Sequence, residues 1–295
     1  MVYLKDFSLP VLRDEDKFLL SYPYQLEMKC FSHDNVYPFR LFPQKGLERL
    51  EFEPITIFYG GNGSGKSTLL NLIAKKLDIP SSAPINDTPY MEDYVSMCRY
   101  AFDSRTEKLP EGSLRIASDD VFDMLLDIRS VNGEIDRKRE ELFEEYYNTR
   151  EKPMEPLRDL SQYEDFKRRI EAKSKTKSVY VSRRLPIAEM EGRSNGETAF
   201  YYFTQKLGEN ALYLLDEPEN SLSPKLQREL SEHLENSARF FGCQLIISTH
   251  SPFLLAMKGA RIYDLDSRPV QVKRWTELEN IKEYYGFFEE HKREF

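Results

Sequence analysis

The sequence lacks a run of apolar residues as long as the ~20 that span a bilayer, which excludes an integral membrane protein with helical spans. Its first residues carry acids and a proline where a secretory signal needs an apolar stretch, so we expect no secretion. Only three cysteines occur, Cys30, Cys98 and Cys243, without the spacing of a metal site or of a disulfide pattern. They predict reduced thiols in a cytoplasmic protein.

Apolar and charged residues are both abundant. Hydrophobic residues make up 40% of the 295 positions, which is enough for a core and argues against wholesale disorder. The net charge of −8 argues against a uniformly basic nucleic-acid-binding protein, although a local basic patch stays possible. The length predicts two domains, or one large α/β unit with an inserted subdomain.

The composition changes twice along the chain. Residues 1–85 and 195–275 combine short apolar strands with amphipathic helices, which predicts an α/β core with a mixed or parallel sheet and antiparallel amino-terminal strands. Residues 86–194 predict an inserted helical subdomain, and residues 276–295 a charged carboxy-terminal helix. The first 60 residues predict only strands and turns. The expected strands are 24–31, 47–52, 55–59, 211–215, 244–248 and 261–265, and the expected helices 66–77, 118–147, 161–173, 194–208 and 224–239.

A glycine-rich segment between a predicted strand and a predicted helix fits the pattern G-x-x-x-x-G-K-[ST]. Its glycines let backbone N–H groups converge on a phosphate, and the helix adds its positive end. Lys66 would reach the β- and γ-phosphates of ATP, and the Ser67 hydroxyl would bind Mg²⁺. A plain glycine turn is the alternative, but the flanking strand and helix favour nucleotide binding. The predicted nucleotide-binding residues are Gly60, Gly61, Asn62, Gly63, Ser64, Gly65, Lys66, Ser67 and Thr68.

Polar residues follow two further predicted strands. Asp216 and Glu217 end the strand at 211–215, and His250 follows the strand at 244–248. At the carboxyl edge of a parallel sheet, Asp216 would hold Mg²⁺ largely through water, and Glu217 would orient or deprotonate the attacking water. His250 would contact the γ-phosphate. The alternatives are a simple acidic turn for Asp216 and Glu217 and an ordinary core or surface position for His250. The phosphate loop favours the functional interpretation over both.

Together these motifs resemble the ATP-binding-cassette class of P-loop ATPases. That class carries a short signature before the acidic strand, and Ser194-Asn195-Gly196-Glu197 ends there, nineteen residues before Asp216, with Asn195 in place of the first glycine. The resemblance implies that this turn binds the γ-phosphate held by a second subunit. The same residues also fit an ordinary helix capping box.

The segments at 216–224 (DEPENSLSP) and 248–252 (STHSP) narrow the resemblance to ATPases related to the SMC, RecF and OLD proteins. They are most similar to stand-alone bacterial AAA-family ATPases with an ABC fold, over residues 20–90 and 190–275. The resemblance implies Mg²⁺-dependent ATP hydrolysis and an ATP-dependent homodimer that drives a partner protein or nucleic acid, in DNA repair or phage defence. The alternative is the ATP-binding subunit of a transporter.

Two parts of the class pattern are not filled clearly. No glutamine lies between Gln44 and Gln162, where the class places one beside Mg²⁺. Asp119 stands near that place and could contact the ion through water, or it could simply favour a helix amino terminus. The residue that contacts adenine also stays open, because four aromatic or cationic side chains before the phosphate loop could stack on the base or belong to the core. They are Tyr37, Phe39, Arg40 and Phe42.

The segment 167–184 reverses the sign of the chain's charge. It holds eight Lys and Arg residues against Glu171 alone, a net charge of +7. The sequence allows two interpretations, a solvated helix end whose cations pair with Glu140, Glu141, Glu144 and Glu145, or a patch that contacts nucleic-acid phosphates.

Overall fold

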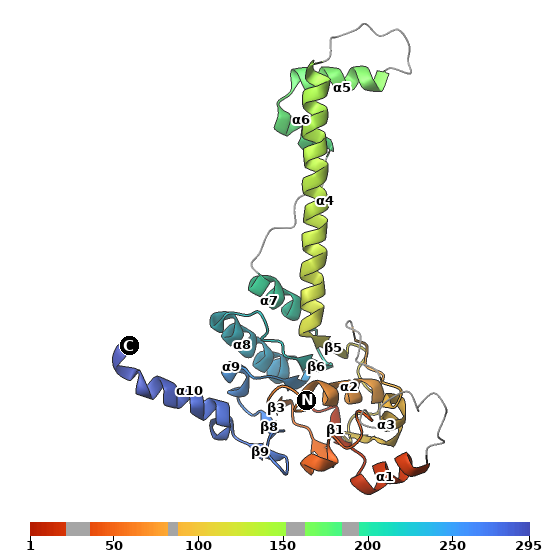
Figure 1. Cartoon of the computed structure of the whole chain (residues 1–295), viewed down its shortest axis with the longest axis vertical. Helices are drawn as coiled ribbons and strands as arrows, with labels where there is room; N and C mark the ends of the chain where they lie inside the picture. Colours follow the sequence, from red (N-terminus) through yellow and green to blue (C-terminus); the bar gives the residue numbers. More distant parts are fainter. Residues whose placement is uncertain (22–35, 82–87, 152–162, 185–194) are drawn as a thin grey trace. The chain divides into compact units, whose positions relative to one another are not determined.

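The computed structural model describes residues 1–21, 36–81, 88–151, 163–184 and 195–295, some of them, including 119, 121–136 and 195, by their backbone only (Figure 1). The chain forms two compact units, Met1–Val121 together with Asn195–Phe295, and Phe122–Ser194. The strand expected at 24–31 lies outside the described residues. Among the helices described, none is both long and apolar enough to cross a membrane.

A six-stranded sheet lies at the centre of the first unit, in the order β5-β6-β7-β3-β8-β9. The first five strands run parallel, and β9 pairs antiparallel with β8. Every residue of β3, β6 and β7 is buried, as in a parallel sheet covered on both faces. The predicted α/β fold with a parallel core is therefore confirmed. The strands are β3 (Ile55–Tyr59), β5 (Leu114–Ala117), β6 (Leu212–Asp216), β7 (Gln244–Ser248), β8 (Arg261–Asp264) and β9 (Gln271–Lys273).

A second, antiparallel sheet has the order β2-β1-β4 and consists of β1 (Leu4–Ser8), β2 (Arg49–Glu51) and β4 (Arg99–Phe102). The side chain of Gln244, fully buried at the start of β7, joins the two sheets. Its Oε1 accepts the N–H groups of Tyr3 and Leu4 at 2.8 Å, and its Nε2 donates to the Leu4 carbonyl at 2.8 Å. One amide thus satisfies three backbone groups at the start of β1.

Helices cover the central sheet. α2 follows the glycine loop after β3, and α8 follows β6 with Ser223 as its amino-terminal cap, the hydroxyl accepting the Leu226 N–H. The helices of the first unit are α1 (Leu12–Ser21), α2 (Lys66–Lys76), α3 (Met91–Met97), α7 (Asn195–Lys206), α8 (Pro224–Phe240), α9 (Pro252–Leu255) and α10 (Glu279–Glu290). The described residues also form the short 3₁₀ helices η2 (Pro43–Lys45), η4 (Trp275–Glu277) and η5 (Lys292–Glu294).

Helix α1 corrects the prediction that the first 60 residues form only strands and turns. Its first turn carries Asp14 and Glu15, which favour the positive end of a helix. Its later residue Phe18 stacks on Phe39 with the ring centroids 5.3 Å apart. Short apolar stretches are ambiguous between strand and helix, and here a tertiary contact favours the helix.

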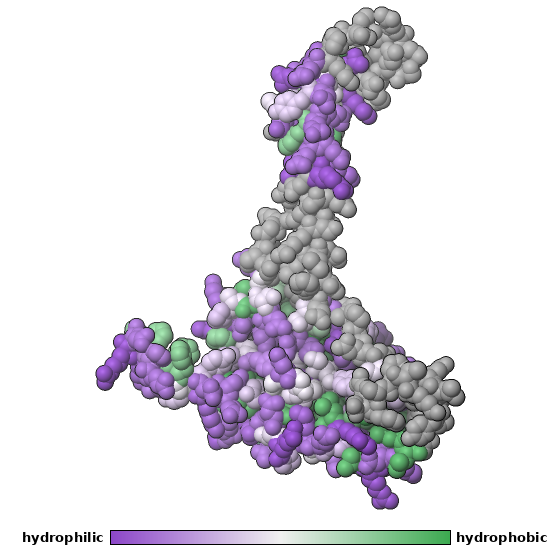
Figure 2. Space-filling model, viewed as in Figure 1, coloured by the Kyte–Doolittle hydropathy of each residue, from purple (hydrophilic) through white to green (hydrophobic). Residues whose placement is uncertain are grey.

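Helix α10 carries exposed aromatic side chains, and apolar surface is visible over it in Figure 2. Ile281, near its start, is buried, whereas Tyr284, Tyr285, Phe287 and Phe288 are all more than half exposed. The helix predicted for the charged end of the chain is therefore strongly aromatic on part of its surface.

The second unit consists of helices only in its described part. α4 (Ser118–Glu151) enters it from the first unit, and α5 (Tyr163–Ser174) and α6 (Lys177–Arg184) follow. A small core contains Tyr146, Ala172, Tyr180 and Val181, with Leu142 and Phe143 packed against it. The unit begins at Phe122 and not at the expected residue 86, because β5 is hydrogen-bonded to β6 in the central sheet.

We expect Gln244→Leu to lower the free energy of unfolding by about 2 kcal/mol, because the backbone groups of Tyr3 and Leu4 lose their buried partners. Urea denaturation measures this loss. Gln271→Leu, on the exposed strand β9, is the matched control and should change stability by no more than about 0.5 kcal/mol. Equal losses in the two variants would contradict the role of Gln244.

Candidate functional site

The glycine loop joins β3 to α2 and presents its backbone to the site. Gly65 has φ +101°, and a Cβ at this position would lie 3.1 Å from the Phe42 ring. Gly63 has φ +77°, and a Cβ at this position would have no atom of the described residues within 4 Å. The first N–H groups of α2 have no partners inside the helix. This loop therefore fits a phosphate group, which needs unhindered N–H donors and a helix amino terminus.

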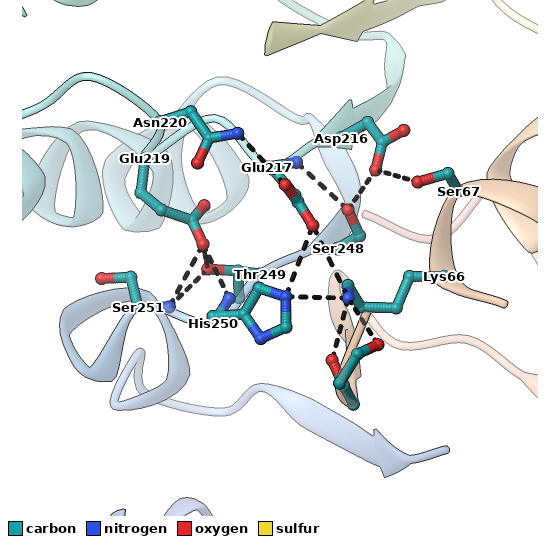
Figure 3. Close-up of polar contacts among 12 residues, drawn as sticks. Lys66, Ser67, Asp216, Glu217, Glu219, Asn220, Ser248, Thr249, His250 and Ser251 are labelled. Carbon is teal, nitrogen blue, oxygen red and sulfur yellow. Dashed lines mark hydrogen bonds and ion pairs between the residues drawn. The ribbon is translucent and has the colours of Figure 1, made fainter. Parts of the chain in front are cut away.

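Lys66 is the centre of the polar contacts in this loop (Figure 3). Its side chain is buried, and its Nζ donates to the Gly60 carbonyl at 2.8 Å and to the Gly61 carbonyl at 3.3 Å. The same Nζ lies 2.8 Å from His250 Nε2 and 3.6 Å from Glu217 Oε1. The structure thus brings together three predicted residues from the segments that follow the adjacent strands β6, β7 and β3.

Glu217 follows β6 in a left-handed backbone conformation, with φ +48°. Its Oε1 lies 3.4 Å from His250 Nε2, and its Oε2 accepts the Asn220 amide at 3.1 Å. The His250 contact lowers the pKa of this carboxyl to about 2, with help from Asn220 and Lys66 and against the effect of burial. Glu217 is therefore ionised at neutral pH and, in this state of the site, better suited to orient a water molecule than to remove its proton.

Asp216 and Ser67 supply adjacent oxygen atoms. Asp216 Oδ1 accepts the Ser67 hydroxyl at 3.0 Å and a close hydrogen bond from the Ser248 hydroxyl. A carboxylate and a hydroxyl are the donors that Mg²⁺ prefers, so this pair fits the ion. Among the described residues no three His, Cys, Asp or Glu side chains cluster as a metal site. Mg²⁺ at this pair would take its other ligands from water and phosphate oxygens.

Arg115 is a member of this site that the sequence reasoning missed. It lies on β5 with its side chain buried, and its guanidinium reaches Asp216 Oδ2 at 3.4 Å and the Ser81 hydroxyl at 3.0 Å. The β5–β6 register pairs Ala117 with Asp216, which places Arg115 one pleat away on the same face. The signal in the sequence was a cation inside the short apolar stretch 114–117. Arg115 holds the second Asp216 oxygen while the first faces Ser67.

The remaining predicted residues are only partly described. Asp119 is the second residue of α4, and its side chain lies outside the described part. Its neighbour Asp120 accepts the Ala117 N–H at 2.7 Å, which is a capping role. Ser194 lies outside the described residues, as does the Asn195 side chain. Glu197 is exposed on α7.

Gly196, also of the predicted signature turn, lies close to the turn that follows Glu217. A Cβ at Gly196 would lie 3.0 Å from the Ser221 carbonyl oxygen and 3.3 Å from Leu226. A larger residue at this position would therefore push the start of α7 away from that turn.

The four candidates for adenine contact differ in burial and in their partners. Phe39 and Phe42 are buried, Phe39 against Phe18 and Phe42 beneath Gly65, so they belong to the core. The Tyr37 hydroxyl shares a 2.6 Å hydrogen bond with Thr68 Oγ1. Arg40 is exposed and forms an ion pair with Asp16 at 3.5 Å.

A glycine loop at a helix start, a buried lysine beside it and acidic residues at the end of β6 in the same sheet define a P-loop ATPase domain. The chain belongs to the family described as "AAA domain, putative AbiEii toxin, Type IV TA system", whose model matches residues 91–256. The resemblance to AAA-family ATPases is thereby confirmed. No curated protein sequence matches the chain.

Several solved structures are similar to this chain at 16% sequence identity. One is an Smc head domain with an extended coiled coil, bound to the C-terminal domain of ScpA, from Pyrococcus furiosus. The match spans 97% of this chain and 100% of the Smc chain, with a TM-score of 0.43. A second is a dimeric ATP-binding cassette in a post-hydrolysis state, bound to ADP and Pi. This match spans 77% of this chain and 88% of the cassette chain, with a TM-score of 0.34. A third is a putative metal-chelate type ABC transporter in an inward-facing conformation. This match spans 78% of this chain and 76% of the transporter chain, also with a TM-score of 0.34.

We expect Arg115→Met to lower the free energy of unfolding by about 3 kcal/mol, because it leaves the Asp216 carboxylate buried without its cation. Urea denaturation without nucleotide measures the loss. Arg261→Met is the control, since Arg261 pairs with the exposed Glu51 and Glu53, and this variant should lose about 1 kcal/mol or less. If both variants lose the same amount, the Asp216 pair is not a structural requirement.

Proposed function

We propose that this chain is a Mg²⁺-dependent ATPase that acts in the cytoplasm as a nucleotide-dependent dimerisation switch and drives a partner protein or nucleic acid. The observation that carries the proposal is the meeting of Lys66, Glu217 and His250 within 3.6 Å, beside the Ser67–Asp216 pair. The family description names a toxin of a toxin–antitoxin system, which supports a defence role over DNA repair.

ATP binding would use groups that now satisfy one another. The Lys66 ammonium, bonded here to the Gly60 carbonyl, would bind the β- and γ-phosphate oxygens, while the loop N–H groups hold the β-phosphate. Mg²⁺ held by Ser67 and, through water, Asp216 would supply charge neutralisation to the phosphates. Arg115 keeps Asp216 in place for this purpose.

Hydrolysis would use Glu217 and His250. The Glu217 carboxylate accepts a hydrogen bond from water and then its proton, as the water oxygen bonds to the γ-phosphorus and the bond to the β-phosphate oxygen breaks. ADP and phosphate are the products. His250 would donate to a γ-phosphate oxygen from Nε2, the atom that lies between Lys66 and Glu217 here.

Dimerisation would complete each site. The predicted signature turn at Ser194, Asn195, Gly196 and Glu197 would bind the γ-phosphate on the phosphate loop of the other subunit, so that two ATP molecules are shared across a two-fold interface. A subunit of a transporter is the second function that the motifs allow, and no contact in the described residues favours it.

The basic segment offers one contact surface for a partner. Lys167, Arg168 and Lys173 are exposed on α5, where the surface is hydrophilic (Figure 2). Lys177, in contrast, lies 3.8 Å from the Phe143 ring centroid and helps to pack α6 against α4. A nucleic acid or an acidic protein would therefore meet the α5 cations first.

The ATPase proposal predicts opposite defects for two variants. Lys66→Ala should lose tight ATP binding, because the phosphates lose their fixed cation. Glu217→Gln should bind ATP but release phosphate roughly 100-fold more slowly, because the carboxylate that handles the water is gone. A fluorescent ATP analogue and a phosphate-release assay measure the two steps, with Glu229→Gln on the exposed part of α8 as the control. Normal turnover in Glu217→Gln would overturn the mechanism.

The dimer proposal predicts that Glu217→Gln accumulates as a dimer with ATP and Mg²⁺, because bound ATP is shared by two subunits and hydrolysis no longer opens the pair. Light scattering at micromolar protein should show a doubled mass with ATP and a monomer without it. Lys66→Ala should stay monomeric in both conditions. A monomeric Glu217→Gln with saturating ATP would count against the shared site.

A further inference from the structure

Glu219 is a buried carboxylate that the proposed mechanism does not use. It lies in the turn between β6 and α8, two residues after Glu217, and only 8% of it is exposed. Its Oε1 accepts the Thr249 hydroxyl at 2.6 Å, the His250 N–H at 2.7 Å and the Ser251 N–H at 3.2 Å (Figure 3). Its Oε2 is buried without a hydrogen-bond partner in the described part of the chain. One oxygen atom thus holds three consecutive residues.

These three donors form the segment that carries His250. Ser251 Oγ also accepts the N–H groups of Phe253 and Leu254 at the start of α9, and it donates to Gln227 Oε1 at 2.7 Å. Thr249 Oγ1 accepts the Ser251 N–H at 3.0 Å as well. Without Glu219 the His250 N–H would have no acceptor shown by the structure, whereas Thr249 and Ser251 would keep other contacts. The His250 backbone therefore depends on Glu219 most directly.

The imidazole of His250 is held by the same turn from its other side. Glu217 Oε1 lies 3.4 Å from His250 Nε2, while Glu219 Oε1 holds the His250 N–H. The pair Glu217 and Glu219 therefore sets both the ring and the backbone of one histidine. A displacement of about 1 Å at a reacting group is enough to reduce a rate roughly 100-fold.

We propose that Glu219 is a positioning residue for ATP hydrolysis, which fixes His250 against Glu217 and Lys66 and does not itself touch the nucleotide. This inference rests on the proposed ATPase function. Burial raises the pKa of Glu219, against the effect of its hydrogen bonds, so a neutral side chain with one accepting oxygen should replace it well. Glutamine is that replacement, since its Oε1 can accept the same three donors.

The test compares Glu219→Ala and Glu219→Gln in the full chain. Glu219→Ala should lower kcat roughly 10- to 100-fold with the ATP dissociation constant changed by no more than about 2-fold, because phosphate binding belongs to the glycine loop. Glu219→Gln should recover most of kcat. Glu235→Ala is the matched control, because Glu235 Oε1 also accepts a backbone N–H, that of Lys258 at 2.9 Å, from an exposed segment outside the site.

A second measurement does not depend on hydrolysis. The chain has four histidines, so the ring signals of His250 can be assigned in NMR spectra by comparison with His250→Gln. Glu219→Ala should move the His250 ring signals and leave those of His291 in place, and Glu219→Gln should restore them. If the unmodified protein does not hydrolyse ATP, the proposed function fails, and these signals alone decide whether Glu219 positions the ring.

Two results would overturn the inference. One is a folded Glu219→Ala protein with the kcat and His250 signals of Glu235→Ala. The other is a parallel loss of ATP binding, kcat and thermal stability that glutamine does not reverse, which would make Glu219 a residue of general stability.

Discussion

The hydrogen bonds of Ser248 hold the two acidic residues of the site together. Ser248 is fully buried at the end of β7, and its hydroxyl donates to Asp216 and accepts the Glu217 N–H at 3.1 Å, while its carbonyl accepts the same N–H at 3.0 Å. These bonds accompany the left-handed turn at Glu217, which directs its side chain toward Lys66 and not along the strand. The parallel register that pairs Ser248 with Asp216 and with Phe58 brings the ends of β6, β7 and β3 to one edge. The site depends on this register, since a shift by one residue would reverse the face of every side chain.

The turn after β6 connects parts of the chain that are far apart in sequence. Glu217 contacts Lys66 and His250, Glu219 holds the backbone of the His250 segment, and Ser221 lies against Gly196 at the start of α7. Ser221 has a positive φ, +68°, as Glu217 does. Two residues of this turn therefore adopt a backbone conformation that residues other than glycine rarely take. A displacement of α7 would therefore also move the turn that positions the candidate catalytic groups. If the proposed dimer forms through α7, this turn would connect its interface to Glu217 and His250.

The elements that could be predicted from the sequence are those with strong local signals. β3 and β7 have the predicted boundaries, because short β-branched stretches ending in glycine or in Ser-Thr-His leave little ambiguity. The residues Lys66, Glu217 and His250 were identifiable because each follows such a strand or its loop. Arg115 was not, because its role depends on the pairing of β5 with β6, a contact 99 residues apart in the register Arg115–Leu214. The core positions of Phe39 and Phe42 depend equally on the packing of α1 and of the glycine loop, which no local pattern reveals.

The contacts of Lys66 and His250 affect the basicity of Glu217. The ammonium group is shared between the Gly60 carbonyl, His250 and Glu217, so the buried cation has partners within the protein. Lys66 and His250 are also among the causes that lower the pKa of Glu217 to about 2. In the proposed reaction both would turn toward phosphate oxygens. Glu217 would then lose these contacts and face additional negative charge, and both changes would raise its pKa. With ATP bound as proposed, Glu217 would therefore be a stronger base than its present contacts make it.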